Sequence, residues 1–168
     1  MTSARTSASL ALTVALLAGV APQFTRPAVR GGTVNLGRLR GHDVLVSFLN
    51  TAARAGRDRS RAQVVFLRSM ATQYRNLRIV IVDTSRSSRK ALVNYTYDWA
   101  LPRAISVLAD DGSLARRYRV RRVPTTFLIG RNGRIADRWD AYVPPARLAF
   151  AIAASMRTPS ASVRKTTQ

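Results

Sequence analysis

The sequence of 168 residues contains no cysteine. Its absence excludes disulfide bonds, thiolate nucleophiles and thiolate metal sites, because each of these needs the cysteine sulfur. It does not fix a compartment, since a chain without cysteine is compatible with oxidising and reducing surroundings alike. The length predicts one domain, because domains of about 100–200 residues bury most of their apolar surface.

Acidic residues are also scarce. Eight of them stand against 28 lysines and arginines, which gives a formal net charge of +20 and a sequence pI near 11.9. Only Lys90 and Lys165 are lysines, and the many arginines together with abundant Ala, Val and Leu are typical of a GC-rich coding background. A positive field of this size attracts acidic proteins, anionic lipid headgroups and nucleic acid. Nucleic acid is the least favoured, because aromatic residues do not alternate with the arginines as a base-stacking platform requires.

Histidine is limited to His42, so a Ser-His-Asp arrangement would have to use this residue. It precedes a predicted core strand, at the end of the sheet away from the turn discussed below, and is interpreted as a solvated turn residue. Asp83 and the pair Asp110 and Asp111 are explained by turn and helix-capping roles. The sequence has no glycine-rich phosphate loop. We therefore predict no metal site and no cofactor.

The sequence also lacks an apolar run long enough for a membrane-spanning helix of about 20 residues. Residues 10–20 are apolar except for Thr13, and Arg5 is the only cation before them. This pattern is typical of a secretory signal with a short hydrophobic region. We expect residues 1–21 to be a signal-like segment or a short anchor, and the protein to be extracytoplasmic, either secreted or membrane-tethered. An ordinary helix or a misassigned start codon are the alternatives, since Pro22 makes cleavage after Ala21 awkward.

Buried strands and amphipathic helices alternate in the rest of the chain. Apolar, β-branched runs predict strands at residues 43–51, 77–82 and 105–109, and residues 123–130 predict a loop that enters a further strand. Helical spacing or capping residues predict helices at residues 57–74, 89–95, 113–118 and after Pro144 and Pro145. The Asn132–Gly133 pair predicts a hairpin with a type I′ turn. The Ser/Thr-rich, basic residues 158–168 predict a disordered tail.

This order predicts an α/β fold with a mixed central sheet and helices on both faces. Several short motifs occur within it at consistent spacing. They are Ala21-Pro22-x-Phe24, Leu36-x-x-Leu39-Arg40-Gly41, Phe48-x-x-Thr51, Val123-Pro124-Thr125-Thr126-Phe127 and Asn132-Gly133-Arg134-Ile135. Together they resemble the thioredoxin fold of the extracytoplasmic redoxins, thiol–disulfide oxidoreductases that are grouped with the alkyl hydroperoxide reductase and thiol-specific antioxidant family. The resemblance implies a thioredoxin-like redoxin domain at residues 22–157.

The chemistry of these redoxins does not carry over. The resemblance places their Cys-x-x-Cys pair at Ala53 and Gly56, and neither residue can form a mixed disulfide. A peroxidatic cysteine is missing as well. The resemblance also implies a cis peptide bond before Pro124, in a loop of Val123, Pro124 and Thr125 whose backbone can pair with an extended substrate segment.

Arginines gather around this degenerate turn. Arg54, Arg57, Arg59 and Arg61 come at the start of the first predicted helix, where positive charge opposes the helix dipole. Arg121 and Arg122 precede Pro124 and are expected near the same turn. We interpret Arg54, Arg57, Arg121 and Arg122 as a rim that selects an anionic ligand or an acidic partner, although a general spread of arginine explains it equally simply.

Three functions fit the sequence. The first is a redoxin-like binding or accessory module without thiol activity of its own, with a protein partner held along the cis-proline loop. The second is a non-catalytic partner of a cysteine-bearing redox enzyme. The third is a cationic protein held at an anionic membrane surface by its charge and its N-terminal apolar segment.

Overall fold

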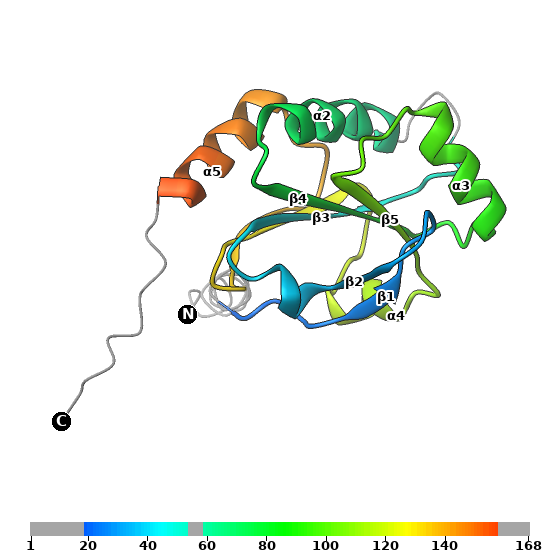
Figure 1. The fold of residues 1–168 in the computed structure, drawn as a ribbon, viewed down its shortest axis with the longest axis horizontal. Coiled ribbons are helices and arrows are strands. Elements are labelled where there is room, and N and C mark those ends of the chain that lie inside the picture. The colour runs from blue at the N-terminus through cyan, green and yellow to red at the C-terminus, as the bar shows by residue number, and fades with distance from the viewer. Residues whose placement is uncertain (1–18, 54–58, 158–168) are drawn as a thin grey trace, which may run out of the picture.

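A five-stranded mixed sheet in the order β5-β4-β3-β6-β7 forms the centre of the molecule (Figure 1). The structure is a computed structural model, which describes residues 19–53 and 59–157. The elements in chain order are β1 (Thr25–Pro27), β2 (Thr33–Asn35), the 3₁₀ helix η1 (Leu36–Leu39), β3 (Asp43–Leu49), α2 (Ser60–Gln73), β4 (Leu77–Asp83), α3 (Arg89–Asp98), β5 (Ile105–Ala109), α4 (Ser113–Arg117), β6 (Thr125–Ile129), β7 (Ile135–Trp139) and α5 (Pro145–Arg157). This order confirms the predicted α/β architecture with a mixed sheet.

The register of the strands brings three chain segments to one edge of the sheet. β3, β4 and β5 run parallel, with Leu49 opposite Asp83 and Asp83 opposite Ala109. β6 runs antiparallel to β3, with Thr125 opposite Phe48. The residues that follow β3 and β4 therefore meet the residues that precede β6. This edge holds the degenerate turn and the Pro124 loop.

Each face of the sheet has its own core. All seven residues of β3 are buried, and successive side chains point to opposite faces. One core contains Leu45 and Leu49 and is covered by α2, α3 and α5. The other contains Val46 and Phe48 and is covered by the β1–β2 ribbon, η1 and α4 (Figure 1). The prediction that this strand is buried on both faces is confirmed.

The described chain is paired with the sheet before Pro22. The backbone N–H of Ala21 donates to the Gly133 carbonyl at 2.9 Å, Val20 forms an isolated bridge with Arg134, and Ala21 is buried. Most of the predicted signal-like segment, residues 1–18, lies outside the described residues, as does the predicted tail at residues 158–168. In the part of the chain that the structure describes, no helix is long and apolar enough to cross a membrane.

The β6–β7 hairpin forms where it was predicted, but the prediction of a type I′ turn was wrong. Gly133 has a φ of 78°, whereas Asn132 keeps a negative φ, and a type I′ turn needs positive values at both central residues. The Gly133 N–H donates to the Gly130 carbonyl at 2.8 Å, and the Arg134 N–H donates to the Asn132 side-chain oxygen at 2.9 Å. Asn132 thus uses its side chain to close the turn, and Gly133 alone takes the left-handed conformation.

Candidate functional site

A buried carboxylate and a group of hydroxyls lie beneath the degenerate turn. Asp83, the last residue of β4, has no solvent exposure. Its Oδ1 accepts a 2.7 Å hydrogen bond from the Thr51 hydroxyl and others from the Ser85 hydroxyl and backbone N–H, while Oδ2 accepts from the Ser87 N–H at 2.9 Å. The turn role predicted for Asp83 holds, and the structure adds the bond to Thr51 across the parallel strands. Asp83 thus fixes the start of the degenerate turn to the loop that follows β4.

The protonation of Asp83 follows from these contacts. Burial raises the pKa of its carboxyl, but hydrogen bonds from Ser85, Ser87 and Thr51 favour the charged form and together lower the pKa below its ordinary value. Arg86, between the two serines, has a φ of 54°, a left-handed conformation that costs roughly 1 kcal/mol for a residue other than glycine. The hydrogen bonds to Asp83 hold this turn in place.

Of the two positions that the resemblance matches to cysteines, only Ala53 is described. Its backbone N–H donates to the Asn50 carbonyl at 3.3 Å, and the residue is half-buried. Gly56 and the rim residues Arg54 and Arg57 lie outside the described residues. α2 begins at Ser60, and Arg59 is its N-cap residue without a capping side-chain hydrogen bond. The described part of the turn therefore offers a methyl group where a redoxin has a thiol.

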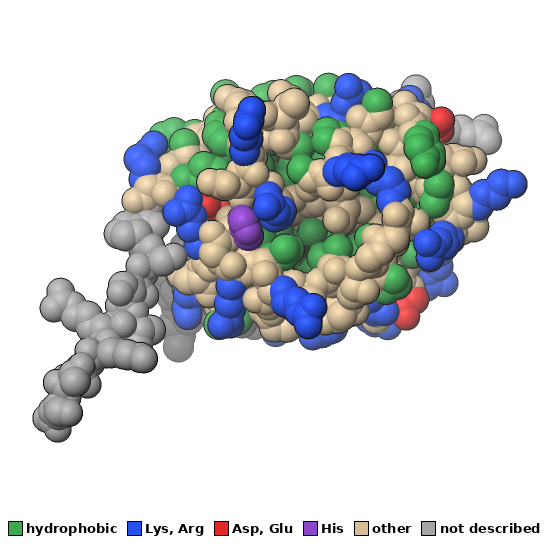
Figure 2. All heavy atoms as spheres, in the orientation of Figure 1, with side chains coloured by type: hydrophobic (Ala, Val, Ile, Leu, Met, Phe, Trp, Pro, Cys, Tyr) green, Lys and Arg blue, Asp and Glu red, His purple; other side chains and the backbone are tan. Residues whose placement is uncertain are grey.

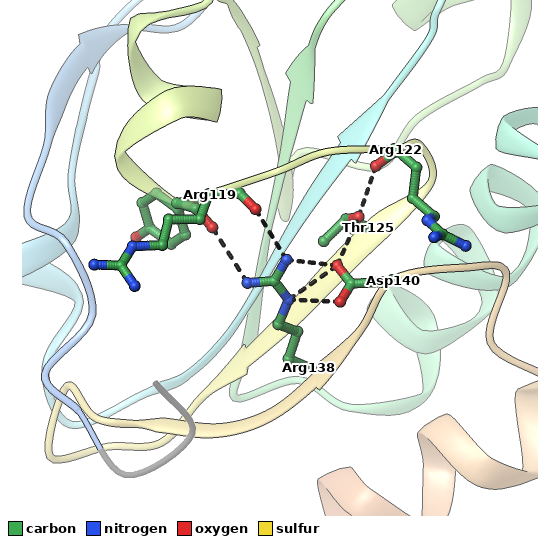
Figure 3. A network of polar contacts seen from close by, with 6 residues as sticks. Arg119, Arg122, Thr125, Arg138 and Asp140 are labelled. Carbon is green, nitrogen blue, oxygen red and sulfur yellow. Dashed lines mark hydrogen bonds and ion pairs between the residues drawn. The ribbon is translucent and has the colours of Figure 1, made fainter. Parts of the chain in front are cut away.

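The Pro124 loop precedes β6 at the edge of the sheet where β3 ends. The peptide bond between Val123 and Pro124 is cis, the isomer that the resemblance implies. Thr125 is buried, and its hydroxyl donates to the Arg122 carbonyl at 2.7 Å and to Asp140 Oδ1 at 3.3 Å (Figure 3). Among the described residues, nothing hydrogen-bonds to the backbone N–H or carbonyl of Val123. The loop thus presents one free pair of backbone groups beside a fixed proline.

A single arginine fixes the approach to this loop. Arg138 of β7 forms an ion pair with Asp140 at 2.6 Å, and two of its nitrogens bond the same carboxylate. The same guanidinium donates to the Arg119 carbonyl at 3.0 Å (Figure 3). It also lies over the Phe127 ring, 5.0 Å from the ring centroid. Arg119 itself has a φ of 51°. This network, which the sequence did not indicate, holds residues 119–125 against the end of β7.

The loop, the N-cap of α2 and the segment after β7 enclose a hollow of about 320 Å³, named here the proline-loop pocket. Its lining residues are Arg59, Arg122, Val123, Pro124, Asp140, Ala141 and Tyr142. Of the predicted rim residues that the structure describes, Arg122 lines this pocket and Arg121 does not. The Arg59 guanidinium lies over the Tyr142 ring at 5.5 Å, and Arg61 lies over Trp99 at 5.1 Å. Aromatic faces thus offset part of the unfavourable cationic start of α2.

Sequence reasoning missed Tyr142, which lines the pocket, and Gln63, which lies behind it. The buried Gln63 side chain accepts a 3.0 Å hydrogen bond from the Val143 N–H and so fixes the segment that carries Tyr142 to α2. His42 is half-buried at the start of β3, the end of the strand away from Ala53. No group of three metal-ligating side chains occurs in residues 19–53 and 59–157.

A model of the AhpC/TSA family matches residues 18–138, which is more than half of the chain. The chain belongs to the AhpC/TSA family. No match was found among curated proteins. The redoxin resemblance inferred from the sequence motifs is confirmed, although a member of this family without cysteine cannot form the disulfide intermediates of thiol redox chemistry.

Solved structures confirm the thioredoxin-like fold. A putative thiol:disulfide interchange protein DsbE from Chlorobium tepidum is 24% identical over 83% of this chain and 96% of its own, with a TM-score of 0.70. A putative thioredoxin from Neisseria meningitidis is 21% identical over 83% and 91%, with a TM-score of 0.72. A secreted Mycobacterium tuberculosis disulfide oxidoreductase is 20% identical over 79% and 96%, with a TM-score of 0.67. At these identities the likeness concerns the fold alone.

Proposed function

We propose that this AhpC/TSA-family protein is a binding module without thiol redox activity, which holds an extended acidic segment of a partner protein in the proline-loop pocket. Both steps of thiol–disulfide exchange require a cysteine thiol, and the chain has no cysteine. The fold nevertheless has the cis-proline loop, and its pocket lies beside the N-cap of α2. The single observation that carries the proposal is this pocket, with exposed arginines and an unpaired backbone around it.

The backbone of Val123 supplies the first contact. Its N–H and carbonyl have no partner in the described part of the chain, so an extended segment can pair with them as an added strand would. Main-chain pairing of this kind gives affinity without sequence preference. Side chains around the pocket must then supply the selectivity.

Charge supplies that selectivity. Arg59 and Arg122 are exposed, and Asp140, the one acidic residue among the described residues that line the pocket, is paired with Arg138. A carboxylate of the partner therefore meets two arginines among the described lining residues. Arginine favours this contact because its planar guanidinium binds a carboxylate through two hydrogen bonds.

Rigidity on one side of the pocket favours binding further. The carbonyls of Arg119 and Arg122 are engaged by Arg138 and Thr125, so the loop is ordered before any partner arrives. A preorganised loop loses little conformational entropy on binding. These contacts support recognition of a partner over a merely inert remnant of an enzyme.

Fluorescence anisotropy with a labelled octapeptide of alternating Glu and Val tests the proposal, with a Lys/Val octapeptide as the comparison. We expect the acidic peptide to bind and the double variant Arg59→Glu/Arg122→Glu to weaken binding by about a hundredfold, because two charge-assisted contacts are lost. The control is Arg68→Glu/Arg75→Glu, which changes net charge equally on exposed residues away from the pocket. Equal loss in both double variants, or equal binding of both peptides, would refute recognition at this pocket.

A further inference from the structure

A second hollow lies on the opposite side of the molecule from α2 and α5, between the β1–β2 ribbon and the sheet. It has a volume of about 420 Å³ and is lined by residues of β2, η1, β4 and β5 and of the segment that enters β5. Figure 2 shows hydrophobic side chains exposed within a hollow in this view, with Lys and Arg side chains around it. This hollow, named here the ribbon pocket, plays no part in the proposed function.

The floor of the ribbon pocket is partly apolar. Val34 of β2 and Val80 of β4 are almost fully buried beneath it, and Leu39 of η1 and Ala104 are the partly exposed apolar residues of its lining. Leu39 is only partly buried, although it packs against the core on this side of the sheet. An apolar floor of this kind gains free energy when a nonpolar group displaces water from it.

The rim of the same pocket is cationic. Three arginines line it, Arg38, Arg78 and Arg103, and no acidic residue does. Arg78 donates to the Arg75 carbonyl at 3.1 Å, whereas the exposed guanidinium groups of Arg38 and Arg103 have no hydrogen bond or ion pair among residues 19–53 and 59–157. Two free guanidinium groups beside an apolar floor match an anion with an apolar body.

We propose that the ribbon pocket binds a small amphipathic carboxylate, an aliphatic or aromatic acid whose apolar part lies on the floor and whose carboxylate contacts Arg38 and Arg103. The volume lies within the range of about 300–1,000 Å³ that is usual for small-molecule sites. A carboxylate suits arginine because the guanidinium donates two parallel hydrogen bonds to it. Ser106, half-buried in the wall, adds a hydroxyl that can donate to the same head group.

A neighbouring hollow at the β5 edge provides a matched control. It has a volume of about 720 Å³ and shares Arg103 and Ser106 with the ribbon pocket, but it is also lined by Arg89 of α3. Of these two hollows, Arg38 lines the ribbon pocket alone, and Arg89 lines the neighbouring hollow alone. Substitution of these two exposed arginines therefore separates the two hollows at equal net charge.

Isothermal titration with decanoate below its micelle concentration tests the proposal, with decan-1-ol, decylammonium and acetate as comparison ligands. We expect decanoate alone to bind measurably, because both the chain and the carboxylate contribute. Arg38→Gln and Arg103→Gln should each weaken binding on the order of tenfold, the usual effect of losing one charge-assisted hydrogen bond. Arg89→Gln should leave the affinity unchanged, and circular dichroism should show all three variants folded.

The other outcomes each overturn the proposal. Equal binding of decan-1-ol would reduce the site to an apolar patch, and equal binding of acetate would show that the floor is not used. If Arg89→Gln weakened decanoate binding and Arg38→Gln did not, the binding site would be the hollow at the β5 edge. As a variant that blocks the site without altering the core, Thr33→Glu places a carboxylate on the exposed wall residue of β2 and should abolish decanoate binding. Retained binding in Thr33→Glu contradicts the proposal.

Discussion

Asp83 and Asp140 flank the same edge of the sheet and are satisfied in opposite ways. Asp83 is fully buried and accepts hydrogen bonds only from neutral groups of Thr51, Ser85 and Ser87 in the described part of the chain. Asp140 has a side chain 48% exposed and is bound through two nitrogens by Arg138. Although the sequence has 28 lysines and arginines, none of those in residues 19–53 and 59–157 pairs with this buried carboxylate.

The comparison separates scaffold from recognition. Neutral donors satisfy Asp83 without the desolvation of a second charge, which makes them suited to the interior. An ion pair at the surface is cheaper to form, sensitive to salt and able to fix a loop, which suits the Pro124 loop. Substitution of Asp83 should therefore mainly lower the stability of the fold, and substitution of Arg138 should mainly release the Pro124 loop.

The largest expected effect is on the buried side. Asp83→Asn should lower the free energy of unfolding at pH 7 by about 3 kcal/mol, because an amide group replaces one acceptor oxygen among several donors. The native pKa of Asp83 is lowered, so its charged form stabilises the fold above the unfolded pKa of about 3.9. That stabilisation is lost as the pH falls through the native pKa.

Urea unfolding between pH 7 and pH 3 measures this difference. The difference in the free energy of unfolding between wild type and Asp83→Asn should be constant near neutral pH and should become smaller below about pH 4. Asp98→Asn, an exposed substitution with the same change in charge, should show little effect at any pH. A gap that stays constant down to pH 3 would mean that the charge of Asp83 is not what stabilises this edge.

An intermediate effect is expected on the exposed side. Arg138→Gln removes the ion pair with Asp140 and the bond to the Arg119 carbonyl, and should lower the free energy of unfolding by about 1.5 kcal/mol. The loss should shrink in 1 M salt, where the ion pair is already screened. Thermal unfolding at low and high salt checks this, with the exposed neighbour Arg121→Gln as the control. An effect independent of salt would assign the role of Arg138 to packing on Phe127 instead.

The sequence was informative where a local pattern determines structure. The mostly apolar runs of β3 and β4 predicted buried strands. The sequence offered Ser87 or Ser88 as the N-cap of α3, and Ser88 takes this place, accepting from the Ala91 N–H at 3.2 Å. Pro145 begins α5 as expected. The Asn132–Gly133 pair located a hairpin, yet its turn type depended on a side-chain hydrogen bond that competes with the left-handed backbone.

The site was predictable only in part, because its parts come from distant segments. The family resemblance named Val123 and Pro124, and the arginines that precede them named Arg122. Arg59 was noted in the cationic start of the helix but was not among the predicted rim residues. Tyr142 and Asp140 were not predicted, since nothing local to the end of β7 shows that it reaches the N-cap of α2. The bond from Thr51 to Asp83 had a usable signal, because the carboxyl ends of neighbouring parallel strands meet at one edge.

Substitution of Tyr142 should have the smallest effect on stability and still a measurable effect on peptide binding. The exposed Arg59 has the Tyr142 ring beneath it at 5.5 Å, and this contact is worth about 0.5–1 kcal/mol at a solvent-exposed position. Tyr142→Leu should therefore lower the free energy of unfolding by no more than that amount. It should also weaken binding of the Glu/Val octapeptide by a similar free energy, because Arg59 is no longer held at the pocket. Tyr142→Phe keeps the ring and should behave as wild type in both measurements. If Tyr142→Phe lost peptide binding as well, the hydroxyl and not the ring face would be the contact that matters, and the exposed side of the comparison would depend on a neutral donor just as Asp83 does.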